Sequence, residues 1–139
     1  VKVYQFEGDG SGVVVAEAIQ QNRLPSLLGL HFPADDIPPP ARELFVKAKQ
    51  RVIVDVASQR KMLSQYRLGR SPDQPLVEDI RYSAADPCHL QYLTAMGVSA
   101  SISLPILHQN QLWGLLVVHH SEPRAFTESE LQTVQLLVD

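Results

Sequence analysis

The chain has 139 residues, which is the size of one ordinary domain. Its composition is 45% hydrophobic and 19% charged, and this excludes a disordered or collagen-like chain. The net charge of −3 makes a nucleic acid or an anionic membrane surface an unexpected partner. The single cysteine, Cys88, excludes an internal disulfide and a metal site built from several thiolates.

The ends of the chain show no targeting pattern. No stretch of about twenty apolar residues occurs, and the start lacks the charged-then-apolar pattern of a signal peptide. The sequence therefore predicts a cytoplasmic protein without a membrane segment. Because residue 1 falls in a predicted strand and residue 139 in a predicted helix, we expect residues 1–139 to be one domain of a longer protein with truncated terminal helices.

The first half of the chain predicts two strands, a helix and a third strand. Residues 1–6 alternate, and the β-branched run 13–15 follows a glycine-rich turn that lacks the lysine of a phosphate-binding loop. Apolar residues at helical spacing predict a helix from Ala41, with Asp36 or the neighbouring prolines at its start. Residues 51–56 are rich in valine and isoleucine and predict a strand.

The second half predicts a loop, a helix, a hairpin and a last helix. Residues 57–75 are polar and predict a surface loop, and the helix after Cys88 is expected to end at Gly97. Residues 101–107 and 111–119 predict a hairpin whose second strand is buried on both faces. Thr127 and Glu130 have capping-box spacing ahead of the last helix. This order predicts an α+β fold with a central antiparallel sheet.

Several polar residues are candidates for chemistry, and the sequence alone leaves their roles open. Cys88 is either a buried thiol, a nucleophile or an attachment point. His89 is badly placed as its general base, because neighbouring helical side chains point about 100° apart. His119 and His120 follow a buried strand, so one faces inward and the other outward, and they cannot bind one metal together.

Charged residues leave the same kind of choice. Asp35 and Asp36 are either paired carboxylates or a helix cap beside a solvated side chain. Arg51 and Arg81 are either anion-binding residues or surface residues.

Six segments and a histidine pair, in this order, carry a family resemblance. They are VYQF (3–6), VAEA (15–18), FPADDIP (32–38), DPCHLQYL (86–93), MGVSAS (96–101), LWGLL (112–116) and HH (119–120). Together they resemble the chromophore-binding GAF domain of the phytochrome superfamily, which includes cyanobacterial phytochromes and cyanobacteriochromes. The resemblance covers almost the whole chain and implies a central antiparallel sheet flanked by helices, with a bilin pocket on one face.

The resemblance implies a covalently attached linear tetrapyrrole, phycocyanobilin, held by a thioether to Cys88. The ring of His89 and the backbone carbonyl of Asp36 would contact the pyrrole nitrogens of the protonated bilin. His119 would form a hydrogen bond with the carbonyl of the D ring. The aromatic walls around that ring would be Tyr4, Phe32 and Tyr92.

The two bilin propionates need cations and hydroxyl groups. By resemblance, Arg51 would bind one propionate as a bidentate fork, with Arg81 as a second arginine. Ser101 and Ser103 lie on one face of a predicted strand and would bind the other propionate.

The resemblance implies a red-light-type photoreceptor module rather than an enzyme, with no catalytic residue and no metal. Light would drive Z-to-E isomerisation at C15 of the bilin and control an output domain such as a histidine kinase, in a chain that is a possible homodimer. A single cysteine allows one thioether, so photostates that need a second thioether are not expected. The alternative is a GAF domain without light sensing that binds a small molecule or serves as a dimerisation module.

Overall fold

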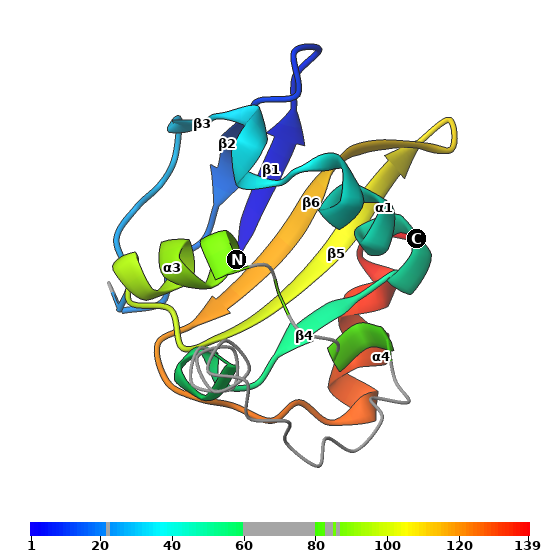
Figure 1. Cartoon of the computed structure of the whole chain (residues 1–139). Helices are drawn as coiled ribbons and strands as arrows, with labels where there is room; N and C mark the ends of the chain where they lie inside the picture. Colours follow the sequence, from blue (N-terminus) through cyan, green and yellow to red (C-terminus); the bar gives the residue numbers. More distant parts are fainter. Residues whose placement is uncertain (22, 60–79, 83–84, 86) are drawn as a thin grey trace, which may run out of the picture.

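The computed structural model describes residues 1–21, 23–59, 80–82, 85 and 87–139. Its six strands form one sheet in the order β3-β2-β1-β6-β5-β4 (Figure 1), and every neighbouring pair is antiparallel. This arrangement confirms the predicted antiparallel sheet. The strands are β1 Lys2–Phe6, β2 Gly12–Glu17, β3 His31–Phe32, β4 Arg51–Ile53, β5 Ala100–His108 and β6 Gln111–His120.

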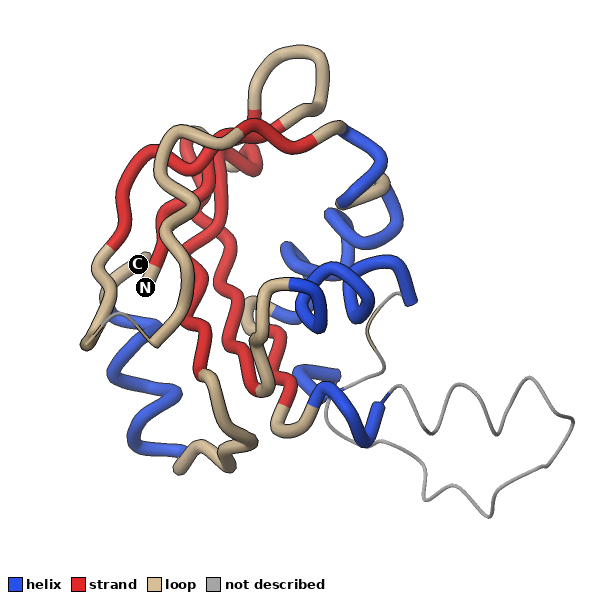
Figure 2. The backbone as a smooth tube through the Cα atoms, turned by 90° about the vertical axis from the view of Figure 1, so that its left-hand side faces the viewer, coloured by secondary structure: helices blue, strands red, loops and turns tan. Residues whose placement is uncertain are grey.

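Helices cover both faces of the sheet. Figure 2 shows α4 on one face of the sheet and the helices α1 and α3 on the other. Within the part of the chain that the structure describes, no helix is long and apolar enough to cross a membrane. The helices are η1 Ala34–Asp36, α1 Pro39–Ala48, η2 Ile80–Tyr82, α3 Pro87–Ala95 and α4 Glu128–Leu136, and residues 56–59 are also helical.

The period of two along each strand divides its apolar residues between the two faces of the sheet. On the α4 face, Ile102, Leu104 and Leu116 pack against Leu131 of α4. On the opposite face, Tyr4, Val14 and Leu115 pack against Phe45 of α1. Leu115 and Leu116 are 2% and 8% exposed, which confirms that the second strand of the hairpin is buried on both faces.

The hairpin of β5 and β6 is the longest pairing in the sheet and confirms the hairpin predicted over residues 101–107 and 111–119. Its turn falls at Gln109 and Asn110, whose φ angles of 52° and 62° are both positive. Such a turn has the twist that joins two antiparallel strands tightly. It sets the register in which Ser101 lies opposite His119 and Ser103 opposite Val117.

The structure decides what begins α1, and it shows that Asp36 does not cap the helix. The N-cap residue is Pro38, without a side-chain hydrogen bond, and Pro39 and Pro40 occupy the first turn. Prolines are tolerated there because the first amides of a helix have no partner within the helix. Asp36 lies in η1, before the helix, and does not act as its cap.

The strand predicted over residues 51–56 is shorter in the structure. β4 ends at Ile53, and a helical turn begins at Val56. The Asp55 carboxylate accepts hydrogen bonds from the amides of Ala57 and Ser58, so it starts this turn as an N-cap does. Most of the predicted loop over residues 57–75 lies outside the described residues.

The helix α3 is anchored to the sheet by fully buried leucines. Leu90 and Leu93 are 0% exposed and pack with Ile53 and Val98. Burial of each leucine stabilises the fold by about 2 kcal/mol. Gly97, with a φ of 78°, ends the helix as predicted, and its amide donates to the Thr94 carbonyl.

The helix α4 begins with the predicted capping box. The Thr127 hydroxyl accepts from the Glu130 amide, and the Glu130 carboxylate accepts from the Thr127 amide. A hydrogen bond of 2.8 Å from the buried Gln50 side chain to the Leu131 carbonyl ties the helix to the start of β4.

Gly114 permits the close approach of β6 and β1, and its replacement tests the sheet. A Cβ atom at this position would lie 2.2 Å from the carbonyl oxygen of Tyr4. We expect Gly114→Ala to lower the free energy of unfolding by about 3 kcal/mol in urea denaturation, because backbone must move to admit the methyl group. Gly8→Ala is the matched control, since a Cβ there meets no atom within 4 Å. Equal stability of the two variants would contradict the close β1–β6 contact.

Candidate functional site

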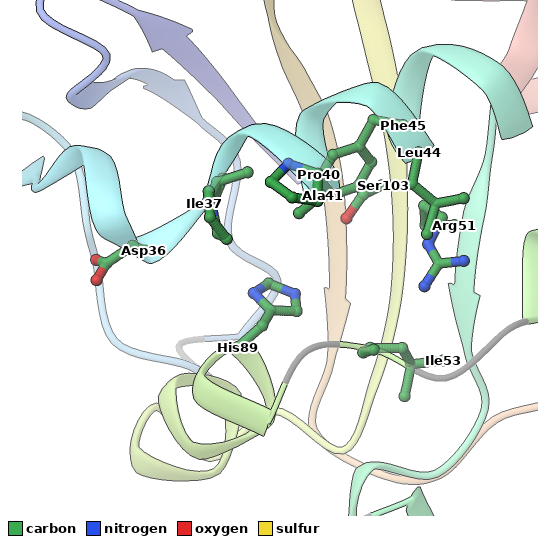
Figure 3. A pocket seen from close by; sticks show the side chains of 12 residues that line it. Asp36, Ile37, Pro40, Ala41, Leu44, Phe45, Arg51, Ile53, His89 and Ser103 are labelled. Atoms are coloured by element: carbon green, nitrogen blue, oxygen red, sulfur yellow. The ribbon is translucent and has the colours of Figure 1, made fainter.

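A cavity of about 320 Å³ lies between the sheet and the segment η1–α1. Asp36, Leu44 and Phe45 line it from that segment, Arg51 from β4 and His89 from α3. In Figure 3, Asp36 and Arg51 lie at opposite ends of the view, with the imidazole of His89 between them. A space of this size is typical of a site for a small organic molecule.

A smaller cavity of about 60 Å³ extends the site along the sheet. Both cavities are lined by Asp36, Ile37, His89 and Ser103, so they adjoin one another. We call the two together the groove. The residues that line only its smaller part include Lys2, Tyr4, Phe32, Tyr92 and His119.

Aromatic rings form a continuous wall along the smaller part of the groove. The ring centroids of Tyr4 and Phe32 are 5.9 Å apart, and those of Phe32 and Tyr92 are 5.2 Å apart and perpendicular. Tyr92 also stacks on His89 with a centroid distance of 6.4 Å. The structure thus brings together the three predicted aromatic residues and His89, although they come from three different elements.

Asp36 places a negative charge beside the hydroxyl groups of this wall. Burial, followed by the Asp36 charge, raises the pKa of Tyr4 to about 12. Burial, the Tyr4 hydroxyl and Asp36 together raise the pKa of Tyr92 as well. Both phenols therefore stay protonated at neutral pH and can donate hydrogen bonds into the groove. Asp35, by contrast, is exposed.

His119 is the inward-facing member of the histidine pair, as predicted. It lines the groove, while the Nδ1 atom of His120 lies 2.9 Å from the Glu122 carbonyl. Among the described residues, His119 Nδ1 is buried without a hydrogen-bond partner. Burial, followed by the charge of Lys2, lowers the pKa of His119 to about 3, so the imidazole is neutral. A buried nitrogen of this kind needs a partner, and the groove is where a ligand would supply one.

Lys2 is a groove residue that the sequence reasoning missed. It is only 5% exposed, and burial lowers its pKa while Glu17 opposes the change. The signal was present, since the alternation of residues 1–6 places Lys2 on the same face as Tyr4. A lysine near a chain end is usually solvated, and only the packing of β1 beside β6 shows that this one is covered.

Arg51 and the two predicted serines lie at the other end of the site. Arg51 lines the larger cavity, donates to the Ile80 carbonyl at 3.0 Å, and has a pKa that burial lowers. Ser103 lies opposite Arg51 across the β4–β5 pairing and lines both cavities. Ser101 is 1% exposed and lies on the same face of β5, opposite His119.

Arg81 is the predicted site residue that the structure does not bring to the groove. Its guanidinium forms a bidentate ion pair with Glu128, with N–O distances of 3.0 and 3.1 Å. It also donates to the Gln50 side chain at 3.4 Å. Because both terminal nitrogens of the Arg81 guanidinium donate to the Glu128 carboxylate, this ion pair connects η2 to α4. Arg81 lines a different cavity, next to Glu128.

Cys88 is the second residue of α3, directly before His89, whose ring lines the groove. The side chain of Cys88 lies outside the described part of the structure, so its role as an attachment point stays a prediction. In the described residues, no group of three or more His, Cys, Asp and Glu side chains is arranged to hold a metal ion.

The chain matches one protein family over nearly all of its length. A family model described as the GAF domain matches residues 4–139. The chain is 43% identical over 122 residues to cyanobacterial phytochrome A of Nostoc sp. and 40% identical over 127 residues to the phytochrome-like protein Cph1 of Synechocystis sp.. These matches include 86% and 89% of this chain, which spans 16% of the length of each relative.

Solved structures agree with the family match. The phycocyanobilin-bound GAF domain from a cyanobacterial phytochrome is 52% identical, with a TM-score of 0.76 over 99% of this chain and 69% of that one. A phycoerythrobilin-bound GAF domain from a cyanobacterial phytochrome is 55% identical, with a TM-score of 0.78 and the same coverage. The chain therefore belongs to the GAF domain family and, within it, is related to the bilin-binding GAF domains of phytochromes.

Proposed function

We propose that the chain is the chromophore-binding domain of a longer photoreceptor and carries a linear tetrapyrrole attached to Cys88. The observation that carries this proposal is the position of Cys88 next to His89, whose ring lines both parts of a groove of suitable size. Its structural relatives hold two different bilins. Phycocyanobilin is the bilin that we propose for this chain.

The described residues fit such a group. A bilin is long, largely apolar and polar at its edges, and the groove is lined by aromatic rings with polar groups at both ends. Arg51 and Ser103 supply a cation and a hydroxyl for propionates at one end. The unpartnered nitrogen of His119 matches a polar atom of a pyrrole ring at the other. Asp36 supplies the negative charge that a buried cationic bilin requires.

When bound, the bilin would absorb visible light and change between Z and E geometry at C15. The residues of the groove would then have distinct tasks. His89 and Asp36 would hold the pyrrole nitrogens, and the aromatic wall would exclude water from the moving ring. His119 and Tyr92 would form different hydrogen bonds in the two states, which gives a two-state switch with light as input. A red-absorbing dark state is part of this proposal.

Signal output would leave the domain through α4. The side chain of Gln50 joins the start of β4 to the Leu131 carbonyl, and the next residue, Arg51, lines the groove. Beyond this contact α4 ends at Leu136, which is 76% exposed, and the following residue, Leu137, is 72% exposed. We propose that a histidine kinase or another output domain follows, that a homodimer forms, and that the domain itself is not catalytic and is cytoplasmic.

The attachment site is tested by replacing the cysteine. When the chain is produced together with phycocyanobilin, we expect a zinc-fluorescent band on a denaturing gel for the wild type and none for Cys88→Ala. Only a covalent bond survives denaturation, and the chain contains one cysteine. A wild-type chain without the band would overturn the bilin proposal and favour a GAF domain that binds a diffusible ligand or only dimerises. A fluorescent Cys88→Ala protein would show that the anchor lies elsewhere.

The two arginines should differ in their effect on bilin uptake. We expect Arg51→Gln to slow bilin incorporation at limiting pigment about tenfold, because the variant loses one charge-assisted hydrogen bond to a propionate. Arg81→Gln should leave uptake unchanged, because Arg81 binds Glu128 outside the groove. Absorbance growth after mixing apoprotein with phycocyanobilin measures both rates. Equal slowing by the two variants would show that Arg81 also reaches the propionates.

His119 should affect colour without affecting attachment. We expect His119→Ala to shift the absorption maximum or lower the yield of photoconversion, because its nitrogen loses contact with the bilin. His108→Ala is the control, since His108 is exposed at the far end of β5. An unchanged spectrum and photocycle in His119→Ala would remove His119 from the site.

A further inference from the structure

Gly12 leaves a gap between two aromatic side chains on the groove face of the sheet. It is buried in β2, opposite Phe6 on β1 and opposite Phe32 on β3. Residues directly opposite each other in neighbouring strands share a face, so these three positions form one row across three strands. This row belongs to the face that carries Tyr4 and Phe32 to the groove.

The ring of Tyr4 fills the gap at Gly12. Its centroid lies 5.2 Å from that of Phe6, with the two rings at 83°, and 5.9 Å from that of Phe32. A Cβ atom on Gly12 would lie 2.0 Å from Cζ of Tyr4. The far end of the ring therefore rests directly on β2, and we call this position the seat of Tyr4.

Space, and not backbone conformation, is what requires glycine at position 12. Among the described residues, the glycines with a positive φ are Gly10, Gly29 and Gly97. Gly12 instead pairs with both neighbouring strands in an extended backbone that any residue can adopt. A glycine inside a strand packs no side chain and often marks a place where another group approaches closely. Here that group is the phenol of Tyr4.

A ring moved off this seat would enter the groove. On one side stands Phe6, which is held by the Arg42 guanidinium 4.2 Å from its centroid, and Arg42 in turn donates to the Ile37 carbonyl at 2.8 Å. On the other side stands Phe32, which is part of the aromatic wall. Carbon atoms in contact need about 3.5 Å, so a methyl group at position 12 would push the end of the ring about 1.5 Å away from β2. The smaller cavity, which Tyr4 lines, has a volume of about 60 Å³.

We propose that Gly12 is a positioning residue that determines how much room the terminal ring of the bilin has to rotate. It acts through Tyr4, because the seat on β2 keeps the phenol out of the smaller cavity. That cavity is the part of the groove lined by His119, where the moving ring would lie. The inference rests on the proposed bilin function and adds to it a residue that, in the described part of the structure, lines neither part of the groove.

Variants of the phycocyanobilin-loaded protein separate the effect of Gly12 from that of Tyr4. Gly12→Ala adds the methyl group, and Tyr4→Leu removes the end of the ring on which this group would press. A double variant combines both changes. Gly8→Ala is the matched control, because a Cβ atom there meets no atom within 4 Å. The measurements are the covalent bilin content, the yield of photoconversion, the fluorescence and the free energy of unfolding in urea.

We expect Gly12→Ala to keep its covalent bilin but to lower the yield of photoconversion about fivefold, the smallest factor that overpacking by one methyl group implies. Its fluorescence should rise, because an excited bilin whose ring cannot turn loses its main competing route to emission. In the Tyr4→Leu background the same substitution should leave photoconversion and fluorescence unchanged. Gly8→Ala should resemble the wild type.

The comparison of the two backgrounds decides the proposal. An equal effect of Gly12→Ala with and without the Tyr4 ring would overturn it, and so would an unchanged photocycle in a folded Gly12→Ala protein. If Gly12→Ala alone does not fold, recovery of folding in the double variant supports the seat, and failure of both variants overturns it. A wild type without covalent bilin would instead overturn the proposed function, and this outcome is visible before any substitution is made.

Discussion

The antiparallel pairing of β1, β6, β5 and β4 determines most of what this domain can do. Because side chains alternate between the faces of a strand, one register makes two surfaces of opposite character. Even-numbered residues of β5 and β6, such as Ile102 and Leu116, form an apolar layer under α4. Odd-numbered residues, such as Ser103 and His119, carry polar groups to the other face. Stability and ligand binding therefore share the same hydrogen-bonded ladder.

The groove has a polar cost that apolar packing on both faces of the sheet offsets. His119 Nδ1 is buried without a partner among the described residues, and such a group weakens a fold until something pairs with it. The fully buried leucines of α3 and the packed layer beneath α4 supply the compensating stability. A ligand that forms a hydrogen bond with the buried nitrogen would remove this cost, and the free energy recovered would add to the affinity of binding.

Much of this arrangement follows from sequence patterns, because the patterns are local. The hairpin turn at Gln109 and Asn110 and the capping box of Thr127 each depend on neighbours only a few residues away. The family resemblance adds which histidine of the pair faces inward and which residues meet across the fold, such as Tyr4 and Tyr92. Their wall of rings comes from segments too far apart in the chain for spacing to reveal.

Sequence reasoning leaves a choice open where tertiary contacts decide between equal local alternatives. Arg81 looked like a propionate ligand, but Glu128 lies close enough on α4 to take both arms of its guanidinium. Either Asp36 or the neighbouring prolines could have begun α1, and three consecutive prolines begin it. For Arg81 the deciding residue, Glu128, lies far away in the chain. For α1 the backbone geometry of the prolines decides where the helix begins.

The turn between α1 and β4 shows how tightly the two faces are coupled. Lys49, with a φ of 63°, ends the helix, and the next two side chains go to opposite sides: Gln50 to α4 and Arg51 to the groove. A single residue inserted or deleted there would turn the Gln50 side chain toward the groove and the Arg51 side chain toward α4. The carbonyl of Leu131 would lose its amide at the same moment that the groove lost its guanidinium. At this turn a change of length would therefore alter both the lining of the groove and the attachment of α4.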